Sequence, residues 1–328
     1  MKIETQPFLI YNEHIMKKII QHTLFLLSFL SLYTSVNAAT NNISNQRHCA
    51  HIKLQILGEG GPEINDGLAS SSYLVWINNK ARVLVDAGGG SSFNFEKSAA
   101  NFNDLQAILL SHLHVDHSAE IPVYLKAGYF SGRKNNLPLF GPAQGGNFPS
   151  TEAFINALIS DRQSSAYPYL ADNLYQQAST DFLIIPQSIH AEKKPWQKKI
   201  TDDLLIKAIN VNHGSIPALA WRVESKQCSI TFSGDMNGSS GNLQKLAKNT
   251  NILVAHNAIA QQAFSVAKEL HMTPLMIGKI AQQAKVKKLV LSHFMLRSIN
   301  KKQETKAFIR KSYSGEIIEA QALMMIEL

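Results

Sequence analysis

The chain has 328 residues, of which 45% are hydrophobic, so it can bury a sizeable core and is not a disordered, collagen-like or coiled-coil protein. The formal net charge of +8 at pH 7 favours anionic partners. The basic residues stand in short groups such as Lys193-Lys194 and Lys287-Lys288, which is typical of a solvated surface rather than a nucleic-acid groove. We therefore expect no stable nucleic-acid partner.

Residues 1–38 have the order of upstream residues followed by a secretory signal peptide. A basic start at Met16-Lys17-Lys18 precedes an apolar stretch over 24–30, and Val36-Asn37-Ala38 supplies the small residues of a cleavage site. A membrane anchor is the less favoured alternative, because the apolar run is interrupted and short for a span. We expect Met16 to be the initiator and the mature protein, one domain over 39–328, to be exported to the periplasm or secreted without a membrane span.

The two cysteines, Cys49 and Cys228, do not have the spacing of metal ligands. In a reducing cytosol they would be inert buried thiols, whereas an oxidising compartment allows a disulfide between them. Because the N-terminus indicates export, we favour the disulfide.

Short apolar runs bounded by turn residues predict a series of strands. They are expected at residues 51–57, 73–77, 82–85, 106–110, 204–211, 219–223, 229–232, 252–255 and 288–291. Helices are expected at 151–159, at 258–269, and from the N-cap Thr273 and Pro274 to about Ala284. Mixed hairpins and strand–helix units indicate sheets with helices outside them. Residues 133–200, rich in proline, serine and asparagine, are interpreted as a lid or insertion.

Metal-binding side chains are concentrated just after the predicted strand 106–110, in Ser111-His112-Leu113-His114-Val115-Asp116-His117. Imidazole nitrogen and carboxylate oxygen suit zinc, and strand ends are where α/β folds place their sites. Alternate residues of an extended chain share a face, so His112 and His114 can reach one ion, while Asp116 and His117 can reach a second. With 12 histidines in the whole chain, this density is a poor fit to chance.

Three further strand ends present side chains of the same kind. His213 follows the strand 204–211, Asp235 follows 229–232, and His293 follows 288–291. Each alone would be an ordinary loop residue. Together with residues 112–117 they predict a site for two metal ions.

Residues 112–117 resemble the His-x-His-x-Asp-His signature of the metallo-β-lactamase superfamily, and the order His213, Asp235, His293 is similar to its remaining ligands. More narrowly, the segments 57–62 (LGEGGP), 137–142 (LPLFGP), 271–274 (HMTP) and 291–294 (LSHF) resemble the ribonuclease Z branch. The resemblance covers about residues 50–295. It implies an α/β protein, an αββα sandwich of two mixed β-sheets packed face to face with helices on both outer faces.

The resemblance also implies a ligand set for two Zn²⁺ ions, with Mn²⁺ or Fe²⁺ as alternatives. One ion would be held by His112, His114 and His213, the other by Asp116, His117 and His293, with Asp235 bridging the two.

Further roles are expected for Asp116 and for side chains outside the ligand set. Asp116 would also orient the nucleophile and accept its proton. His271 is the candidate for protonating the leaving group or stabilising the phosphate, with a structural histidine at a helix start as the alternative. Asp86 matches an aspartate that orients the signature loop, and a plain strand-end turn residue is an equal alternative. His190 and His256 are interpreted as structural.

Two departures from ribonuclease Z bear on the substrate. Asn257 follows His256 where that branch has a glutamate supporting the histidine matched by His271, and no Gly- and Lys-rich arm for transfer RNA is found. We therefore expect a zinc-dependent hydrolase that uses a metal-bridged hydroxide on a small anionic ester, a phosphodiester first. An aryl sulfate, a phosphate monoester, a lactone or another acyl ester is an alternative substrate. A non-catalytic periplasmic metal-binding protein is the other alternative, and a homodimer is compatible with all of these.

Overall fold

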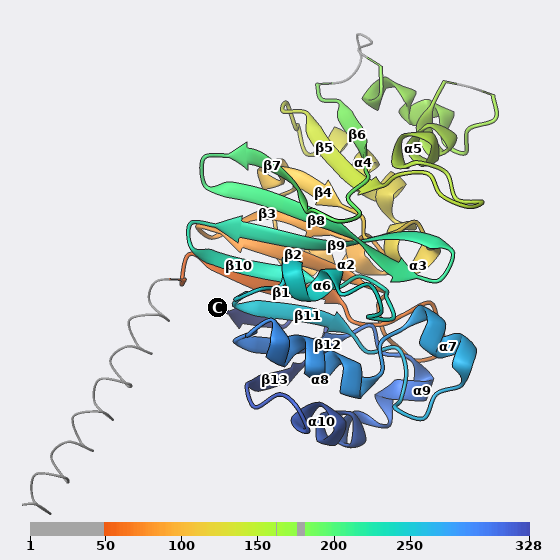
Figure 1. The fold of residues 1–328 in the computed structure, drawn as a ribbon. Helices are drawn as coiled ribbons and strands as arrows, with labels where there is room; N and C mark the ends of the chain where they lie inside the picture. The colour runs from red at the N-terminus through yellow and green to blue at the C-terminus, as the bar shows by residue number, and fades with distance from the viewer. Residues whose placement is uncertain (1–48, 162, 176–180) are drawn as a thin grey trace, which may run out of the picture. The chain divides into compact units, whose positions relative to one another are not determined.

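Two seven-stranded β-sheets form the centre of the molecule, with helices on their outer faces (Figure 1). The computed structural model describes residues 49–161, 163–175 and 181–328. Residues 51–328 form one compact unit. The predicted signal peptide, residues 1–38, lies outside the described residues. The predicted αββα sandwich is confirmed.

The first sheet has the strand order β14-β1-β2-β3-β4-β5-β6. Its strands are β1 (Ile52–Gly58), β2 (Ser72–Ile77), β3 (Lys80–Val85), β4 (Ala107–Leu109), β5 (Leu137–Pro142), β6 (Ile184–Ile189) and β14 (Met325–Glu327). Strands β3 to β6 are parallel, whereas β1, β2, β3 and β14 pair antiparallel.

The second sheet has the order β13-β12-β11-β10-β9-β8-β7. Its strands are β7 (Trp196–Thr201), β8 (Leu204–His213), β9 (Ile216–Ser225), β10 (Cys228–Phe232), β11 (Ile252–His256), β12 (Lys288–Ser292) and β13 (Glu316–Glu319). Strands β10 to β13 are parallel, and β7 to β10 are antiparallel. Both sheets are therefore mixed, and each has a set of parallel strands whose carboxyl ends can carry a site.

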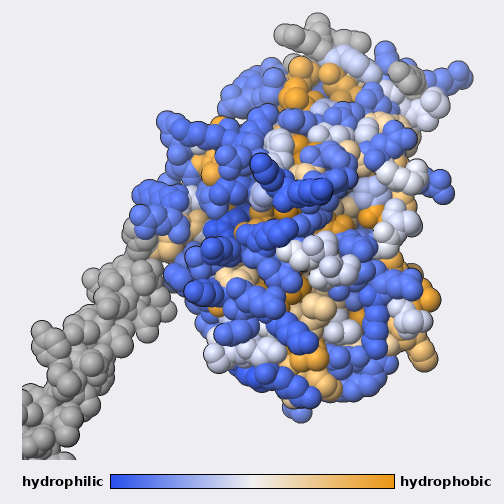
Figure 2. All heavy atoms as spheres, in the orientation of Figure 1, coloured by the Kyte–Doolittle hydropathy of each residue, from blue (hydrophilic) through white to orange (hydrophobic). Residues whose placement is uncertain are grey.

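Each sheet packs against its own helices and forms its own core cluster. The helices are α2 (Ser91–Lys97), α3 (Val115–Ser118), α4 (Ile121–Phe130), α5 (Thr151–Ile159), α6 (Asn242–Leu246), α7 (Ser265–Leu270), α8 (Pro274–Gln283), α9 (Leu296–Ile299) and α10 (Lys302–Arg310), with 3₁₀ turns at Phe102–Asp104 and Pro168–Asn173. Strands β10 and β11 are buried along their whole length. The face shown in Figure 2 is largely hydrophilic, as expected when the apolar side chains lie between the layers.

The predicted hairpin over 73–85 is present, and its turn explains the choice of residues. Asn78 and Asn79 both have positive φ, at 52° and 58°. A two-residue turn between twisted antiparallel strands needs this left-handed backbone, and asparagine tolerates it better than most residues.

The interpretation of residues 133–200 as a lid or insertion is wrong. This segment contributes β5 and β6 to the first sheet and the edge strand β7 to the second. Pro138 and Pro142 stand inside β5. Proline lacks an N–H group and is typical of turns, so the sequence of this segment did not predict a buried parallel strand. The helix expected at 258–269 is also shorter, because residues 258–260 are buried outside any helix and α7 begins at Ser265.

Helix α8 begins as the sequence predicted. The Thr273 hydroxyl accepts a hydrogen bond from the Met276 N–H at 3.4 Å, and Pro274 occupies the first turn. Gly278, in the middle of this helix, faces α10 so closely that a Cβ would lie 2.6 Å from the Ile309 carbonyl oxygen. A glycine inside a helix therefore marks a close helix–helix approach here.

We expect Gly278→Ala to destabilise the protein by about 1–3 kcal/mol. Alanine improves helix propensity by about 1 kcal/mol, but overpacking against backbone atoms, which cannot move aside, outweighs that gain. Urea unfolding measures the difference. Lys279→Ala, on the exposed side of the same helix, is the control and should change stability by no more than about 0.5 kcal/mol. A Gly278→Ala protein as stable as the wild type would contradict the close packing of α8 on α10.

Candidate metal centre

The predicted ligands come together at one edge of the two sheets, where parallel strands end. The His112–His117 segment follows β4, and Asp86 follows β3 directly. On the second sheet, Asp235 follows β10, and His293 follows β12 directly. His213 is the last residue of β8. Strand ends of two sheets thus deliver side chains that are distant in sequence to one place.

One group of ligand atoms consists of His112, His114 and His213, whose ring nitrogens lie within 4.8 Å of one another. Nδ1 of His213 is held by the Leu270 carbonyl oxygen at 2.8 Å, and Nδ1 of His112 lies 3.1 Å from Ser111 Oγ. Nε2 of His112 and Nε2 of His213 are buried and have no hydrogen-bond partner in the described structure. Buried polar atoms without partners are rare, so these nitrogens fit a bound metal cation.

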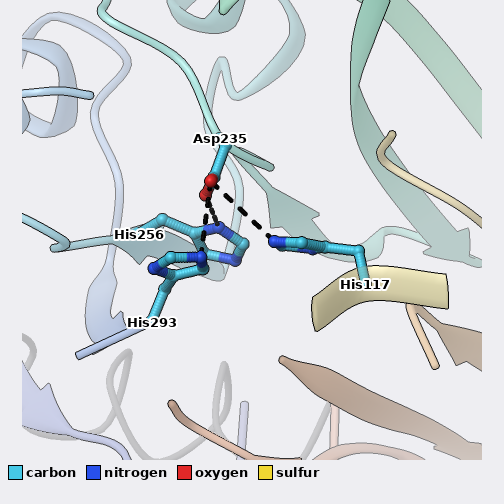
Figure 3. Close-up of side chains that lie close together, drawn as sticks. All are labelled: His117, Asp235, His256 and His293. Atoms are coloured by element: carbon cyan, nitrogen blue, oxygen red, sulfur yellow. Dashed lines mark hydrogen bonds and ion pairs between the residues drawn. The ribbon is translucent and has the colours of Figure 1, made fainter. Parts of the chain in front are cut away.

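A second group gathers around Asp235 and includes His117, His256 and His293 (Figure 3). Asp116 adds its carboxylate, since its Oδ2 lies 3.4 Å from His117 Nε2 and 3.2 Å from His293 Nε2. Nε2 of His117 is again buried and has no hydrogen-bond partner among the described residues. The donor set is imidazole and carboxylate, as zinc, manganese or iron would accept.

Asp235 lies between the two groups. Its Oδ2 atom is 3.8 Å from His117 Nε2, 3.3 Å from His293 Nε2 and 3.8 Å from His213 Nε2. The first two histidines belong to one group of ligand atoms and His213 to the other. One carboxylate oxygen therefore faces both groups, which is the placement that a bridging ligand requires.

Asp86 holds the signature loop from behind. Its Oδ1 accepts the Ser111 N–H at 2.7 Å, and its Oδ2 accepts the Ser111 hydroxyl at 2.8 Å and lies 2.8 Å from His117 Nδ1. The side chain is 1% exposed, so water does not compete for these contacts. The backbone of Asp86 also has a positive φ of 56°, as a strand-end turn would. Both sequence interpretations of Asp86 thus describe features that are present.

Charge and burial favour the metal-binding forms of Asp116, Asp235 and His112, whereas the neighbouring carboxylates raise the pKa of His117 and His293. Burial opposes ionisation of Asp116 and Asp235, but His117 and His293 lie beside both carboxylates and lower the pKa of each below its usual range. Burial lowers the pKa of His112, so its ring is neutral near pH 7. Ionised carboxylates and neutral imidazoles are the forms that bind metal ions.

His271 lies beside the cluster, with Nδ1 buried without a partner and 3.7 Å from Asp235 Oδ2. Burial is the main cause that lowers the pKa of His271 to about 3, so the ring is neutral near pH 7. Asn257 donates from Nδ2 to the Ile259 carbonyl oxygen at 3.2 Å, and its own Oδ1 is buried without a partner. The Asn257 amide group thus donates to the backbone of Ile259.

His256, interpreted from the sequence as structural, lies in the second group of side chains beside Asp235. Its Nδ1 lies 2.7 Å from Asp235 Oδ1 and its Nε2 lies 3.1 Å from the Tyr73 hydroxyl, so both nitrogens have partners. The sequence held a signal for this position. His256 ends β11, and the neighbouring strand β10 precedes Asp235. His190, by contrast, lies outside the cluster, with 65% of its side chain exposed beside Glu192.

A cavity of about 190 Å³ opens onto the cluster. Its walls include Asp116 and His271, and also Met295 and Arg297. Arg297 Nε donates to the Ala258 carbonyl oxygen at 2.9 Å, which fixes the guanidinium at the wall. The cavity therefore combines the metal-ligand cluster with a fixed positive charge.

Cys49 and Cys228 are both disulfide-bonded, and neither is a free thiol. Among the residues that the structure describes, no helix is long and apolar enough to cross a membrane.

Comparisons with known proteins agree with this geometry. A family model described as "Beta-lactamase superfamily domain" matches residues 81–294. A protein named ribonuclease Z from Clostridium tetani is 23% identical over 289 residues, which cover 74% of this chain and 88% of the relative. A protein of the same name from Picrophilus torridus is 26% identical over 302 residues, covering 81% and 94%. Among solved structures, the human tRNase Z short form superposes with a TM-score of 0.62 at 20% identity and covers 84% of this chain and 98% of its own.

Proposed function

The chain belongs to the metallo-β-lactamase superfamily, as a ribonuclease Z-like member, and from this premise we propose that it is a zinc-dependent phosphodiesterase. The observation that carries the proposal is Asp235, whose Oδ2 faces two groups of ligand atoms that include unpartnered Nε2 atoms. The relatives named ribonuclease Z support phosphodiester chemistry.

The ligand assignment follows the two groups of atoms. His112, His114 and His213 would hold one metal ion, Asp116, His117 and His293 the other, and Asp235 would contact both. Bound there, divalent ions supply a water molecule of lowered pKa and neutralise charge on the ester. Nitrogen and oxygen donors in this mixture make zinc our first candidate, with manganese or iron as alternatives.

The side chains around the cavity account for the rest of the reaction. Asp116 presents an ionised carboxylate that can accept the proton of the attacking water. Arg297 can bind an anionic ester oxygen through its fixed guanidinium. His271 faces the cavity with an unpartnered ring nitrogen, which can hydrogen-bond to the phosphate or to the leaving oxygen.

A panel of substrates tests this function. We expect turnover of bis-(p-nitrophenyl) phosphate and no comparable turnover of p-nitrophenyl sulfate, a lactone or nitrocefin. An RNA with a 3′ extension belongs in the panel because relatives are named for RNA cleavage. We propose that the substrate is a small phosphodiester. If the RNA is cleaved in preference, the substrate is a nucleic acid, and the reaction is still phosphodiester hydrolysis. Protein that binds metal but turns over none of these would favour a non-catalytic metal-binding role.

Removal of metal should lower the melting temperature of the protein. A ligand that binds the folded state at 1,000 times its dissociation constant contributes about 4 kcal/mol of stability, and chelation removes that contribution. Thermal unfolding with and without a chelator, with metal analysis of the same samples, measures the effect. Re-addition of Zn²⁺ should restore the melting temperature. If metal-free protein melts at the same temperature as untreated protein, metal does not stabilise the fold at this cluster.

We also propose that the protein is exported. The disulfide-bonded cysteines support an oxidising compartment, because such bonds are rare in the cytosol of most organisms. N-terminal sequencing of the protein from fractionated cells should find a chain that begins near Ala39 outside the cytosol. A cytosolic protein that begins at Met1 or Met16 would contradict export.

A further inference from the structure

Tyr73 reaches from the first sheet into the second. Its side chain on β2 is fully buried, and its ring centroid lies 5.4 Å from that of Phe232 on β10. The Tyr73 hydroxyl lies 2.8 Å from Ser292 Oγ at the end of β12 and 3.1 Å from His256 Nε2 at the end of β11. One hydroxyl group therefore meets two strand ends of the opposite sheet.

His256 connects Tyr73 to the metal centre. The 2.7 Å contact between His256 Nδ1 and the Asp235 carboxylate requires a proton on Nδ1, which donates to Oδ1. The orientation of the ring then depends on what holds Nε2 at its other side. Among the described residues Tyr73 makes the hydrogen bond to Nε2, and because His256 is 2% exposed, bulk water is not a ready substitute.

Asp235 in turn depends on His256. Its Oδ1 accepts the hydrogen bond from His256, and this leaves Oδ2 between His117, His213 and His293. Rotation of the carboxylate about its last bond would take Oδ2 away from one or both groups of ligand atoms (Figure 3). The contact with His256 is the hydrogen bond that opposes this rotation.

We propose that Tyr73 is a positioning residue for the metal centre. Its hydroxyl orients His256, and His256 orients the carboxylate of Asp235 toward both groups of ligands. A tyrosine hydroxyl can donate or accept, so it matches either proton state of Nε2. The proposal rests on the proposed role of Asp235 as a metal ligand, since partners behind a ligand fix its direction and strengthen metal binding.

Tyr73→Phe tests the proposal, with Tyr124→Phe as the matched control. Phenylalanine keeps the ring and its packing in both variants and removes one buried hydroxyl. Tyr124 is 2% exposed, and its hydroxyl donates to Ser91 Oγ at 3.3 Å, with no contact to the metal centre. We expect the two variants to lose similar thermal stability when both are free of metal. Tyr73→Phe alone should bind Co²⁺ and Zn²⁺ about 10–100-fold more weakly in competition with a chelator, and its kcat should fall with little change in KM.

A double-mutant cycle shows whether the effect passes through His256. Once His256→Gln has removed the connection, adding Tyr73→Phe should cause no further loss of Co²⁺ affinity. Losses that add in full, or a Tyr73→Phe protein that binds Co²⁺ as tightly as the Tyr124→Phe protein, would overturn the proposal. Wild-type protein that binds no Co²⁺ or Zn²⁺ would instead overturn the metal centre itself, so the two failures are distinguishable.

Discussion

Asp116→Asn should reduce kcat for a phosphodiester by about 10²–10⁴-fold, the range for losing a positioned proton acceptor. The Asp116 carboxylate faces the cavity, and His117 and His293 keep it ionised despite its burial. Asparagine has the same shape and an oxygen that can still contact a metal ion, but it carries no charge and accepts no proton. KM should change little, because Arg297 and the rest of the cavity wall are unaltered. Steady-state kinetics at saturating metal measures both constants.

Metal content separates the two roles of Asp116. The rates are divided by the metal bound per chain, so a loss of occupancy is not counted as a loss of chemistry. Asp104→Asn is the control, since Asp104 is partly buried and paired with Lys80 and Arg82 outside the cluster. If the rate of Asp116→Asn falls only in proportion to its metal content, Asp116 is a ligand and the proton acceptor lies elsewhere.

Strand ends made much of the site predictable from sequence. An apolar run with histidine or aspartate within the next three residues marks a side chain at the edge of a sheet, and parallel strands bring such edges together. His112–His117, His213, Asp235 and His293 all show this pattern. His256 shows it as well, but the family resemblance does not count it among the metal ligands, so the sequence left it as a structural residue.

Other features depend on contacts between the two sheets. The local pattern of polar and apolar residues in the sequence does not predict such contacts. Tyr73 reads as one more apolar position of a strand, because nothing local shows that its hydroxyl meets His256 and Ser292 across the sandwich. Strand β5 was hidden by its prolines, whose missing N–H groups are tolerated at their places in this sheet. The sandwich itself followed from the family resemblance more than from local propensity.

Substitutions of Asp86 should have the second large effect, on stability and on metal affinity. Two of them separate its interpretation as a residue that orients the signature loop from its interpretation as a strand-end turn residue. Asp86→Ala removes the acceptor for the Ser111 N–H and for His117 Nδ1. Each buried donor left unpaired costs about 1–3 kcal/mol, so a loss of about 3–5 kcal/mol is expected in urea unfolding of metal-free protein. Alanine also tolerates the positive φ of 56° poorly, which acts in the same direction.

Asp86→Asn is the decisive variant, because asparagine suits a turn with positive φ as well as aspartate does. Its oxygen can still accept the Ser111 N–H, but its amide group then points at His117 Nδ1 and donates where the carboxylate accepted. To accept that bond, neutral His117 must carry its proton on Nε2, the atom that faces the metal centre. We therefore expect a smaller loss of metal-free stability than Asp86→Ala causes, and a 10–100-fold loss of Zn²⁺ affinity in chelator competition. If Asp86 is only a turn residue, metal-free stability and Zn²⁺ affinity should both stay near the wild-type values. An Asp86→Asn protein with unchanged Zn²⁺ affinity would therefore contradict the orienting role.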